Sequence, residues 1–242
     1  MSTSVASPIV HAPVSTPSAY QIAQQQFDRQ RSGVGNVAQH AIRRFVALGG
    51  TVSAVSSWDL KEGSAYTYER AGGVDVDQLL RITDKFGSID MVHPSELGYQ
   101  VLPADAWLTR PVDVLIPAAT ERQITGDNAP GIHLQVRLVI EGANGPTTPE
   151  ADAILENRGI FVVPDVLANS GGVTASYFEQ VQSNTGHYWS HDDVISTLDE
   201  SMMRAFRQIV ETSERERVTL RDAAYMIGVG RVAEAIRLRG WV

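Results

Sequence analysis

The chain has no cysteine, only two lysines and no long apolar run. Without cysteine it can form no disulfide, no thiolate nucleophile and no cysteine-ligated zinc or iron–sulfur site, which is compatible with a reducing compartment. The apolar stretch at residues 112–119 is interrupted by Asp113 and Pro117, and it falls short of the about 18 residues that a membrane span needs. Residues 1–19 contain neither the apolar core of a signal peptide nor the arginines of a transit peptide. We therefore expect a cytoplasmic chain with no membrane partner.

The composition of the 242 residues is that of a globular protein. Hydrophobic residues make up 43% and charged residues 20% of the chain, which excludes wholesale disorder, collagen and coiled coil. The 20 Lys and Arg residues against 28 Asp and Glu residues give a net charge of −8, which repels phosphate backbones. Nucleic acid is therefore not expected as a partner. The length fits one large α/β domain, or one domain with extensions.

The pattern along the chain changes near residue 32. Residues 1–19 are rich in Ser, Thr, Pro and Ala and are predicted to be a disordered tail, and Ala19–Arg31 is predicted to be a short amphipathic helix. We assign residues 32–242 to one domain, because helices there alternate with short Val- and Ile-rich runs, as in βαβ units. The predicted strands are Thr51–Ser56, Val112–Ile116, Arg137–Ile140 and Ile160–Val163. The predicted helices are Asn36–Leu48, Val76–Phe86, Pro149–Asn157, Gly172–Gln182, Val194–Glu211 and Leu220–Arg239, of which the last two form a closing helical arm.

A glycine-rich turn opens the first of these helices. Residues 33–38, GVGNVA, match G-x-G-x-x-A, in which glycines let the backbone approach a dinucleotide pyrophosphate at a helix N-terminus. The preceding residues 27–32 are polar where a buried strand is expected, and Ser57 stands at the strand tip that usually carries an acid, with Asp59 two residues further on. A second copy at residues 228–233 lies inside a helical pattern with no strand before it. We interpret its glycines as permitting close helix packing.

Four segments together resemble the glutamate dehydrogenases and, more broadly, the Glu/Leu/Phe/Val amino-acid dehydrogenases. They are Leu115–Thr125 (LIPAATERQIT), Glu141–Asp152 (EGANGPTTPEAD), Pro164–Glu179 (PDVLANSGGVTASYFE) and Arg221–Val242 (RDAAYMIGVGRVAEAIRLRGWV). The resemblance implies an α/β fold, a Rossmann-type doubly wound, mainly parallel sheet with a C-terminal helical arm. It covers the family's NAD(P)-binding domain without the first strand and without the substrate domain. The predicted helix Ala19–Arg31 is similar to the family's opening helix, which implies either a deletion near Arg29–Gly33 or an error in the gene model.

The resemblance also implies which residues hold the coenzyme, NAD or NADP. They are Gly33, Gly35, Asn36 and Val37 at the pyrophosphate, Ser57 at the adenosine ribose, Ala118 and Ala119 at the ribose linkage, and Asn144 and Asn169 at the nicotinamide ribose and carboxamide. Ser176 matches the position that binds the side-chain carboxylate of an amino-acid substrate. Each has a simpler interpretation, because Asn-Gly and Asn-Ser-Gly are ordinary turn sequences and a helical serine is usually packed or solvated.

The resemblance implies an oxidoreductase that converts glutamate or a related amino acid to the 2-oxo acid and ammonia. That chemistry needs two ligands in contact for hydride transfer and a base for the water. In the family a Lys and an Asp of the substrate domain serve in the activation of this water. The two lysines here, Lys61 and Lys85, are interpreted as solvated surface charges. We therefore predict no catalytic residue and little or no activity for this chain alone. No metal is predicted either, because Tyr188 stands between His187 and His191 where the zinc-protease motif needs Glu.

Two alternatives belong to other classes. In the first, the chain is a non-catalytic module that binds a dinucleotide or docks onto an intact dehydrogenase subunit; in the second, it is a degenerate remnant that folds poorly. The expected protein partners are further copies of this chain or a full-length homologue. A missing central strand would leave two unpaired strand edges, which favours aggregation. Residues 5–14 could supply a replacement, but Pro8 and Pro13 lack ladder donors, so we do not expect a strand there in a central position.

Overall fold

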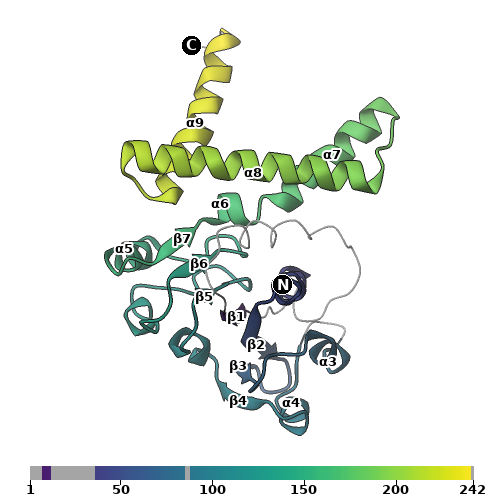
Figure 1. Cartoon of the computed structure of the whole chain (residues 1–242), viewed down its shortest axis with the longest axis vertical. Coiled ribbons are helices and arrows are strands. Elements are labelled where there is room, and N and C mark those ends of the chain that lie inside the picture. The colour runs from purple at the N-terminus through teal and green to yellow at the C-terminus, as the bar shows by residue number, and fades with distance from the viewer. Residues whose placement is uncertain (1–6, 12–35, 85–87, 241–242) are drawn as a thin grey trace.

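The computed structural model describes residues 7–11, 36–84 and 88–240, in which a seven-stranded sheet is covered at one end by an arm of helices (Figure 1). The strands are β1 (Ser7–His11), β2 (Thr51–Asp59), β3 (Ser64–Glu69), β4 (Gln100–Pro103), β5 (Val114–Leu115), β6 (Leu138–Ile140) and β7 (Phe161–Val163), in the order β4-β3-β2-β1-β5-β6-β7. The helices are α2 (Asn36–Ala47), α3 (Val76–Arg81), α4 (Val92–Glu96), α5 (Pro149–Asn157), α6 (Asp165–Ala168), α7 (Gly171–Thr185), α8 (His191–Glu216) and α9 (Leu220–Leu238). The predicted helix Ala19–Arg31 lies outside the described residues.

Most strands of the sheet run in one direction. β5, β6 and β7 pair in parallel, with Val114 opposite Leu138 and Leu138 opposite Phe161. β2 and β5 are both antiparallel to β1, and β3 is antiparallel to its neighbours β2 and β4. Consequently β2, β4, β5, β6 and β7 share one direction and only β1 and β3 oppose it. The predicted α/β class with a mainly parallel sheet is confirmed, and β3, β4 and β1 are additions that the sequence pattern did not predict.

Strand β1 fills the position between β2 and β5. Ser7 lies opposite Ser56 and His11 opposite Thr51, with a register shift between Ile9 and Val10, and β1 also pairs with β5 through Val10 opposite Val114. The predictions of disorder and of no central strand here are therefore wrong for Ser7–His11. Unpaired N–H and C=O groups on the edges of β2 and β5 explain the outcome, because a short irregular strand with Pro at its second position still satisfies more of them than none. The proposed boundary at residues 31 and 32 lies outside the described residues.

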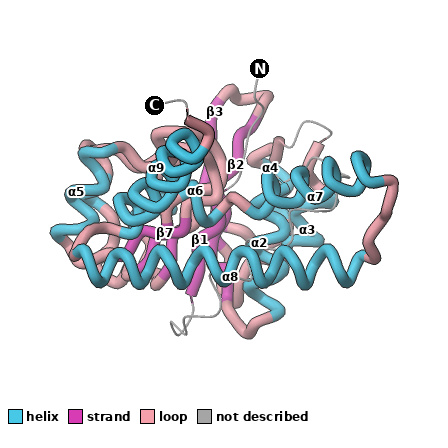
Figure 2. The backbone as a smooth tube through the Cα atoms, turned by 90° about the horizontal axis from the view of Figure 1, so that it is seen from above, coloured by secondary structure: helices cyan, strands magenta, loops and turns pink. Residues whose placement is uncertain are grey.

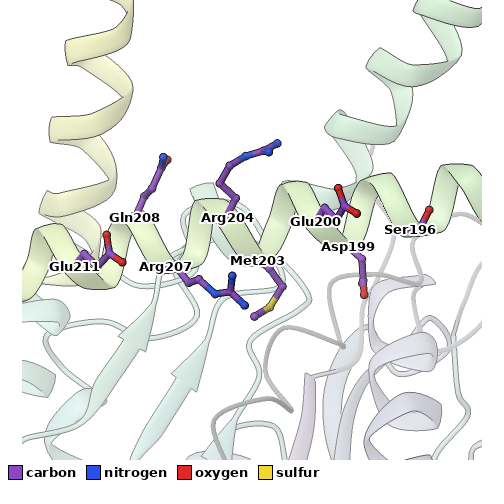
Figure 3. A pocket seen from close by; sticks show the side chains of 8 residues that line it. All are labelled: Ser196, Asp199, Glu200, Met203, Arg204, Arg207, Gln208 and Glu211. Atoms are coloured by element: carbon purple, nitrogen blue, oxygen red, sulfur yellow. The ribbon is translucent and has the colours of Figure 1, made fainter.

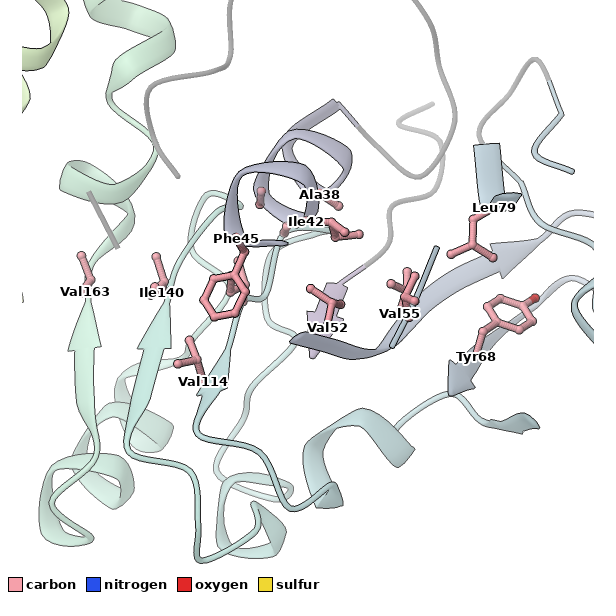
Figure 4. Packing of buried hydrophobic residues seen from close by; sticks show 14 of the residues in the cluster. Ala38, Ile42, Phe45, Val52, Val55, Tyr68, Leu79, Val114, Ile140 and Val163 are labelled. Atoms are coloured by element: carbon pink, nitrogen blue, oxygen red, sulfur yellow. The ribbon is translucent and has the colours of Figure 1, made fainter. Parts of the chain in front are cut away.

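Helices cover both faces of the sheet. On one face, Ala38, Ile42 and Phe45 of α2 pack against Val52 and Val55 of β2, and the same cluster extends to β5, β6 and β7 (Figure 4). On the other face, Leu155 of α5 belongs to a second cluster with Leu115 and Val139. Adjacent residues Val114 and Leu115 thus belong to opposite clusters, as side chains alternate along a strand.

The helical arm crosses the end of the sheet. Helix α8 spans the width of the molecule, and α7 and α9 lead away from it in both views (Figures 1 and 2). Ser190 and Thr219 cap α8 and α9 by accepting hydrogen bonds from the backbone N–H groups of Asp193 and Asp222. A Cβ added at Gly228 or Gly230 would meet nothing within 4 Å, so the prediction that these glycines permit close helix packing is wrong. Among the described residues, no helix combines the length and apolar character needed to cross a membrane.

Candidate functional site at the carboxyl edge of the sheet

The start of α2 meets two strand-end loops at the carboxyl edge of the sheet. β5 and β6 end at this edge, and α2 begins there because it runs back to the start of β2. Gly142, just beyond β6, approaches so closely that an added Cβ would lie 3.1 Å from both Val37 Cγ1 and Ala118 Cβ. The Gly142 N–H donates to the carbonyl of Pro117 at 3.0 Å. Two residues predicted for the coenzyme, Val37 and Ala118, therefore lie together, and Gly142 is the residue between them that we did not predict.

The loops that follow β5 and β6 are joined by backbone hydrogen bonds. Arg122 N–H donates to Gly145 C=O and Ile124 N–H donates to Pro146 C=O, both at 2.8 Å. The backbone N–H of Ala119, another predicted residue, donates to Gln123 Oε1 at 3.1 Å. The two loops are thus tied to each other through their backbones, and Ala118 is buried beside them.

Asn144 and Asn169 come together although 25 positions separate them. Asn169 Nδ2 donates to Asn144 Oδ1 at 2.6 Å. Asn169 ends α6, where its own N–H donates to Asp165 C=O at 3.1 Å. Asn144 precedes Gly145 in the turn after β6. Both residues do terminate or form turns, as the simpler interpretation expects, but that interpretation does not predict that their side chains meet.

Ser57 is buried and its hydroxyl has no partner. The residue is 1% exposed, and Ser57 Oγ makes no hydrogen bond with the residues that the structure describes. It is not at the strand tip, because β2 continues to Asp59 and pairs with β3 through Ser57 opposite Tyr66. Asp59 does not stand where the expected acid would, since it is 1% exposed and its Oδ1 and Oδ2 accept the backbone N–H groups of Lys61 at 2.8 Å and Met91 at 3.0 Å.

The remaining predicted residues lie apart from this group or cannot be placed. Gly33 and Gly35 lie outside the described residues, and of Asn36 only the backbone, as the first residue of α2, is described. Ser176 is exposed on α7 and donates to Gly172 C=O within its own helix at 3.1 Å. Lys61 is paired with Asp90 Oδ2 at 2.5 Å.

A cluster of one arginine and three carboxylates lies next to the segments that carry Asn144 and Asn169. Arg221, near the start of α9, contacts Glu141 at 2.7 Å, Asp152 at 2.5 Å and Asp165 at 3.4 Å. Glu141 is fully buried. Burial opposes the charge of the guanidinium, but hydrogen bonds to Glu141 and Asp152 outweigh it and raise the pKa of Arg221. Sequence reasoning missed this cluster, although all four residues lie within the segments that carry the family resemblance.

A separate hollow of about 680 Å³ runs along α8. Asp199 and Arg207 point from α8 toward the sheet, whereas Arg204 and Gln208 point away (Figure 3). All of its lining residues come from α8, and none is a residue predicted for the coenzyme or the substrate. We therefore place the candidate site at the carboxyl edge and not in this hollow.

Comparison with known proteins agrees with the fold and the motifs. Residues 15–240 match the family model for glutamate/leucine/phenylalanine/valine dehydrogenases. The chain is 42% identical over 209 residues to the NAD-specific glutamate dehydrogenase of Clostridioides difficile, covering 86% of this chain and 48% of that protein. Its structure is similar to those of glutamate dehydrogenase from Peptoniphilus asaccharolyticus (TM-score 0.69, 32% identity, 93% of this chain and 53% of that one) and of the hetero-hexameric enzyme from Thermus thermophilus (TM-score 0.73, 28% identity, 92% and 52%). The chain thus spans about half the length of these relatives, and it belongs to the glutamate/leucine/phenylalanine/valine dehydrogenase family.

Proposed function

We propose that this chain is the NAD(P)-binding half of a glutamate dehydrogenase-like oxidoreductase and that it binds the coenzyme without turning over an amino acid by itself. The observation that carries the proposal is the meeting of predicted coenzyme residues at one edge of the sheet: Val37 with Ala118, and Asn144 with Asn169. In open α/β sheets, ligands bind outside the carboxyl ends of the strands.

We place the adenosine and pyrophosphate half of a dinucleotide at the N-terminal end of α2. Helix α2 has 12 residues and no acidic residue in its first turn, so its N-terminal end presents positive potential to a pyrophosphate. Gly142 is half-buried and leaves no room for a side chain between Val37 and Ala118, so the close approach of the β6 loop to the start of α2 requires glycine. We propose that the adenosine ribose lies at the carboxyl end of β2, near Ser57; because Ser57 is 1% exposed, its hydroxyl is not offered as a ligand of the ribose.

The nicotinamide half would lie at the asparagine pair. Each amide keeps hydrogen-bonding capacity beyond the single bond between them, because Asn169 Nδ2 has a second N–H and Asn144 retains its own amide N–H groups. Asn144 is exposed and Asn169 half-buried, which leaves both within reach of a ligand. The relatives from Clostridioides difficile and Bacillus subtilis are NAD-specific by name, so NAD is the first coenzyme to test.

The proposed lack of activity follows from what the described residues can supply. When bound, the coenzyme would accept a hydride from the Cα of an amino acid. This step needs the amino acid held against the ring, and Ser176 is the one residue that the family resemblance assigns to the substrate. Lys61 is a surface ion-pair partner of Asp90 and Lys85 lies outside the described residues, so neither is offered as a base. We also propose that the substrate is glutamate. A full-length homologue or another chain would supply the opposing substrate domain.

Calorimetric titration of the purified chain with NAD and with NADP tests the proposal. We expect saturable binding of at least one of them, with no glutamate-dependent reduction of NAD in the same preparation. Asn169→Ala should weaken binding, whereas Asn157→Ala should not, because Asn157 ends α5 at the opposite edge of the sheet. No binding of either coenzyme would overturn the proposal, and glutamate-dependent turnover would overturn the proposed inactivity.

Association with another subunit is the second part of the test. One of the structural relatives is described as hetero-hexameric, and we propose that this chain joins an oligomer of itself or of a full-length homologue. Sedimentation velocity of the chain, alone and mixed with a full-length family member, would give a larger species in at least one case.

A further inference from the structure

We infer that Arg221 is a positioning residue, which fixes the turn that bears Asn144 relative to the turn that bears Asn169. The inference rests on the proposed function, since it assigns a role in coenzyme binding to a residue that is not expected to touch the coenzyme. It depends on a chain of contacts from α9 to the turn at Gly145.

The first link joins Arg221 to the ends of β6 and α6. Its Nη2 donates to Glu141 Oε1 at 2.7 Å and its Nη1 donates to Asp165 Oδ1 at 3.4 Å. The other oxygen of Glu141, Oε2, accepts the backbone N–H of Asp165 at 2.8 Å. Arg221 therefore holds two carboxylates that lie at the start of the two asparagine-bearing segments.

The second link joins Asp165 to the turn. Asp165 Oδ2 accepts the backbone N–H of Gly145 at 2.8 Å, directly after Asn144. The carbonyl of Asp165 accepts the N–H of Asn169 at 3.1 Å. Asp165 thus contacts both asparagine-bearing segments, and its Oδ1 is held jointly by the Arg221 guanidinium at 3.4 Å and by the Val166 backbone N–H at 2.8 Å.

The charges make this arrangement dependent on arginine. Glu141, Asp152 and Asp165 face one guanidinium, Glu141 is fully buried, and both Glu141 and Asp165 are further satisfied by backbone N–H groups. A guanidinium presents donors in a fixed planar fork to several acceptors at once, whereas a lysine is a single point charge. Without the guanidinium the three carboxylates repel one another, and Asp165 keeps only its backbone N–H contacts, with Val166 on Oδ1 and Gly145 on Oδ2, both at 2.8 Å. Repulsion from Glu141 and Asp152 then acts against the contact with Gly145.

Comparison of NAD with ADP separates positioning from general stability. ADP lacks both the nicotinamide ring and the ribose attached to it, so its affinity reports only the adenosine and pyrophosphate half of the site. We expect Arg221→Met to weaken NAD binding about tenfold, the effect of losing about one hydrogen bond, while ADP binding changes less than about twofold. Arg158→Met is the matched control, because Arg158 donates to Ala129 C=O at 2.7 Å and Ile132 C=O at 2.6 Å at the opposite edge.

Hydrogen exchange of the segment 142–146 gives a readout that needs no ligand. We expect faster exchange there in Arg221→Met and not in Arg158→Met. If Arg221→Met does not fold, Arg221→Lys is used, with a smaller loss of NAD affinity expected. Unchanged exchange together with an unchanged ratio of NAD to ADP affinity would overturn the inference alone. Failure of the unaltered chain to bind either ligand would overturn the proposed function and the inference with it.

Discussion

Two adjacent glycines after α2 predict different losses of stability for the same substitution. Gly49 has φ +88°, a left-handed conformation, and a Cβ there would meet nothing within 4 Å. Gly50 has no such φ, but its Cβ would lie 1.8 Å from Cε1 of Phe45. Gly49→Ala therefore tests backbone strain, and Gly50→Ala tests overlap with a buried ring.

The expected magnitudes differ by a few kcal/mol. A left-handed alanine costs about 1–2 kcal/mol, partly offset by the lower entropy of the unfolded chain, so Gly49→Ala should cost about 1 kcal/mol. Phe45 is 3% exposed and packs against the sheet (Figure 4), so Gly50→Ala has to displace a core ring. Its cost should approach the about 3–5 kcal/mol of removing such a ring altogether.

Urea denaturation followed by circular dichroism measures these free energies of unfolding. A double-mutant cycle with Phe45→Ala isolates the overlap, because Gly50→Ala should cost almost nothing further once the ring is absent, whereas Gly49→Ala should still cost about 1 kcal/mol. The reasoning is refuted if Gly50→Ala is as costly without the ring as with it, or if Gly49→Ala is the more destabilising change. The result bears on the site, because Phe45 anchors the helix whose first turn carries Val37.

Two further predictions concern the sheet edge and an ion pair. Deletion of residues 1–11 removes β1 and exposes the edges of β2 and β5, so we expect increased light scattering and no single sharp melting transition. Deletion of residues 1–5 is the control. Equal behaviour of the two deletion variants would contradict the role of β1. Hydrogen bonding to Lys61 and to backbone N–H groups of α4 holds the pKa of Asp90 well below its usual range, so its stabilising effect is present above the unfolded pKa of about 4 and is lost as the pH falls below that value. Asp90→Asn should therefore lower the urea midpoint near neutral pH and have a shrinking effect in acid, and a pH-independent difference would count against the ion pair.

The sequence predicted the elements whose signals are local. Helix α5 was predicted with both of its bounds correct, because Thr148 caps it and Pro149 occupies its first turn. Strand β6 was recognised from an apolar run that suits a strand covered on both faces. Strand β3, SAYTYE, is half polar and its partners are the neighbouring antiparallel strands, so its pairing rather than its composition makes it a strand.

Strand β1 is a second case in which pairing, and not local composition, makes a segment a strand. Pro8 argues against a central strand on local grounds, and the segment lies far in sequence from β5. What decides its position is the existence of two unpaired edges, a property of the assembled sheet. The gap in the sheet was predicted and residues 5–14 were considered for it, but they were rejected because local propensity gives no measure of how strongly open edges favour any available strand.

For the candidate site too, the sequence indicated which residues belong to it but not which residues they contact. Asn144 and Asn169 were found from motifs, each within its own segment. Arg221 was not singled out, because its carboxylate partners lie 56, 69 and 80 positions away and a lone arginine on a helix is usually solvated. Three acidic residues in two of the motifs, Glu141 and Asp152 in one and Asp165 in another, were a signal that one cation had to lie among them. A buried carboxylate such as Glu141 requires a partner, and searching the sequence for that partner is the step that would have led from the motifs to Arg221.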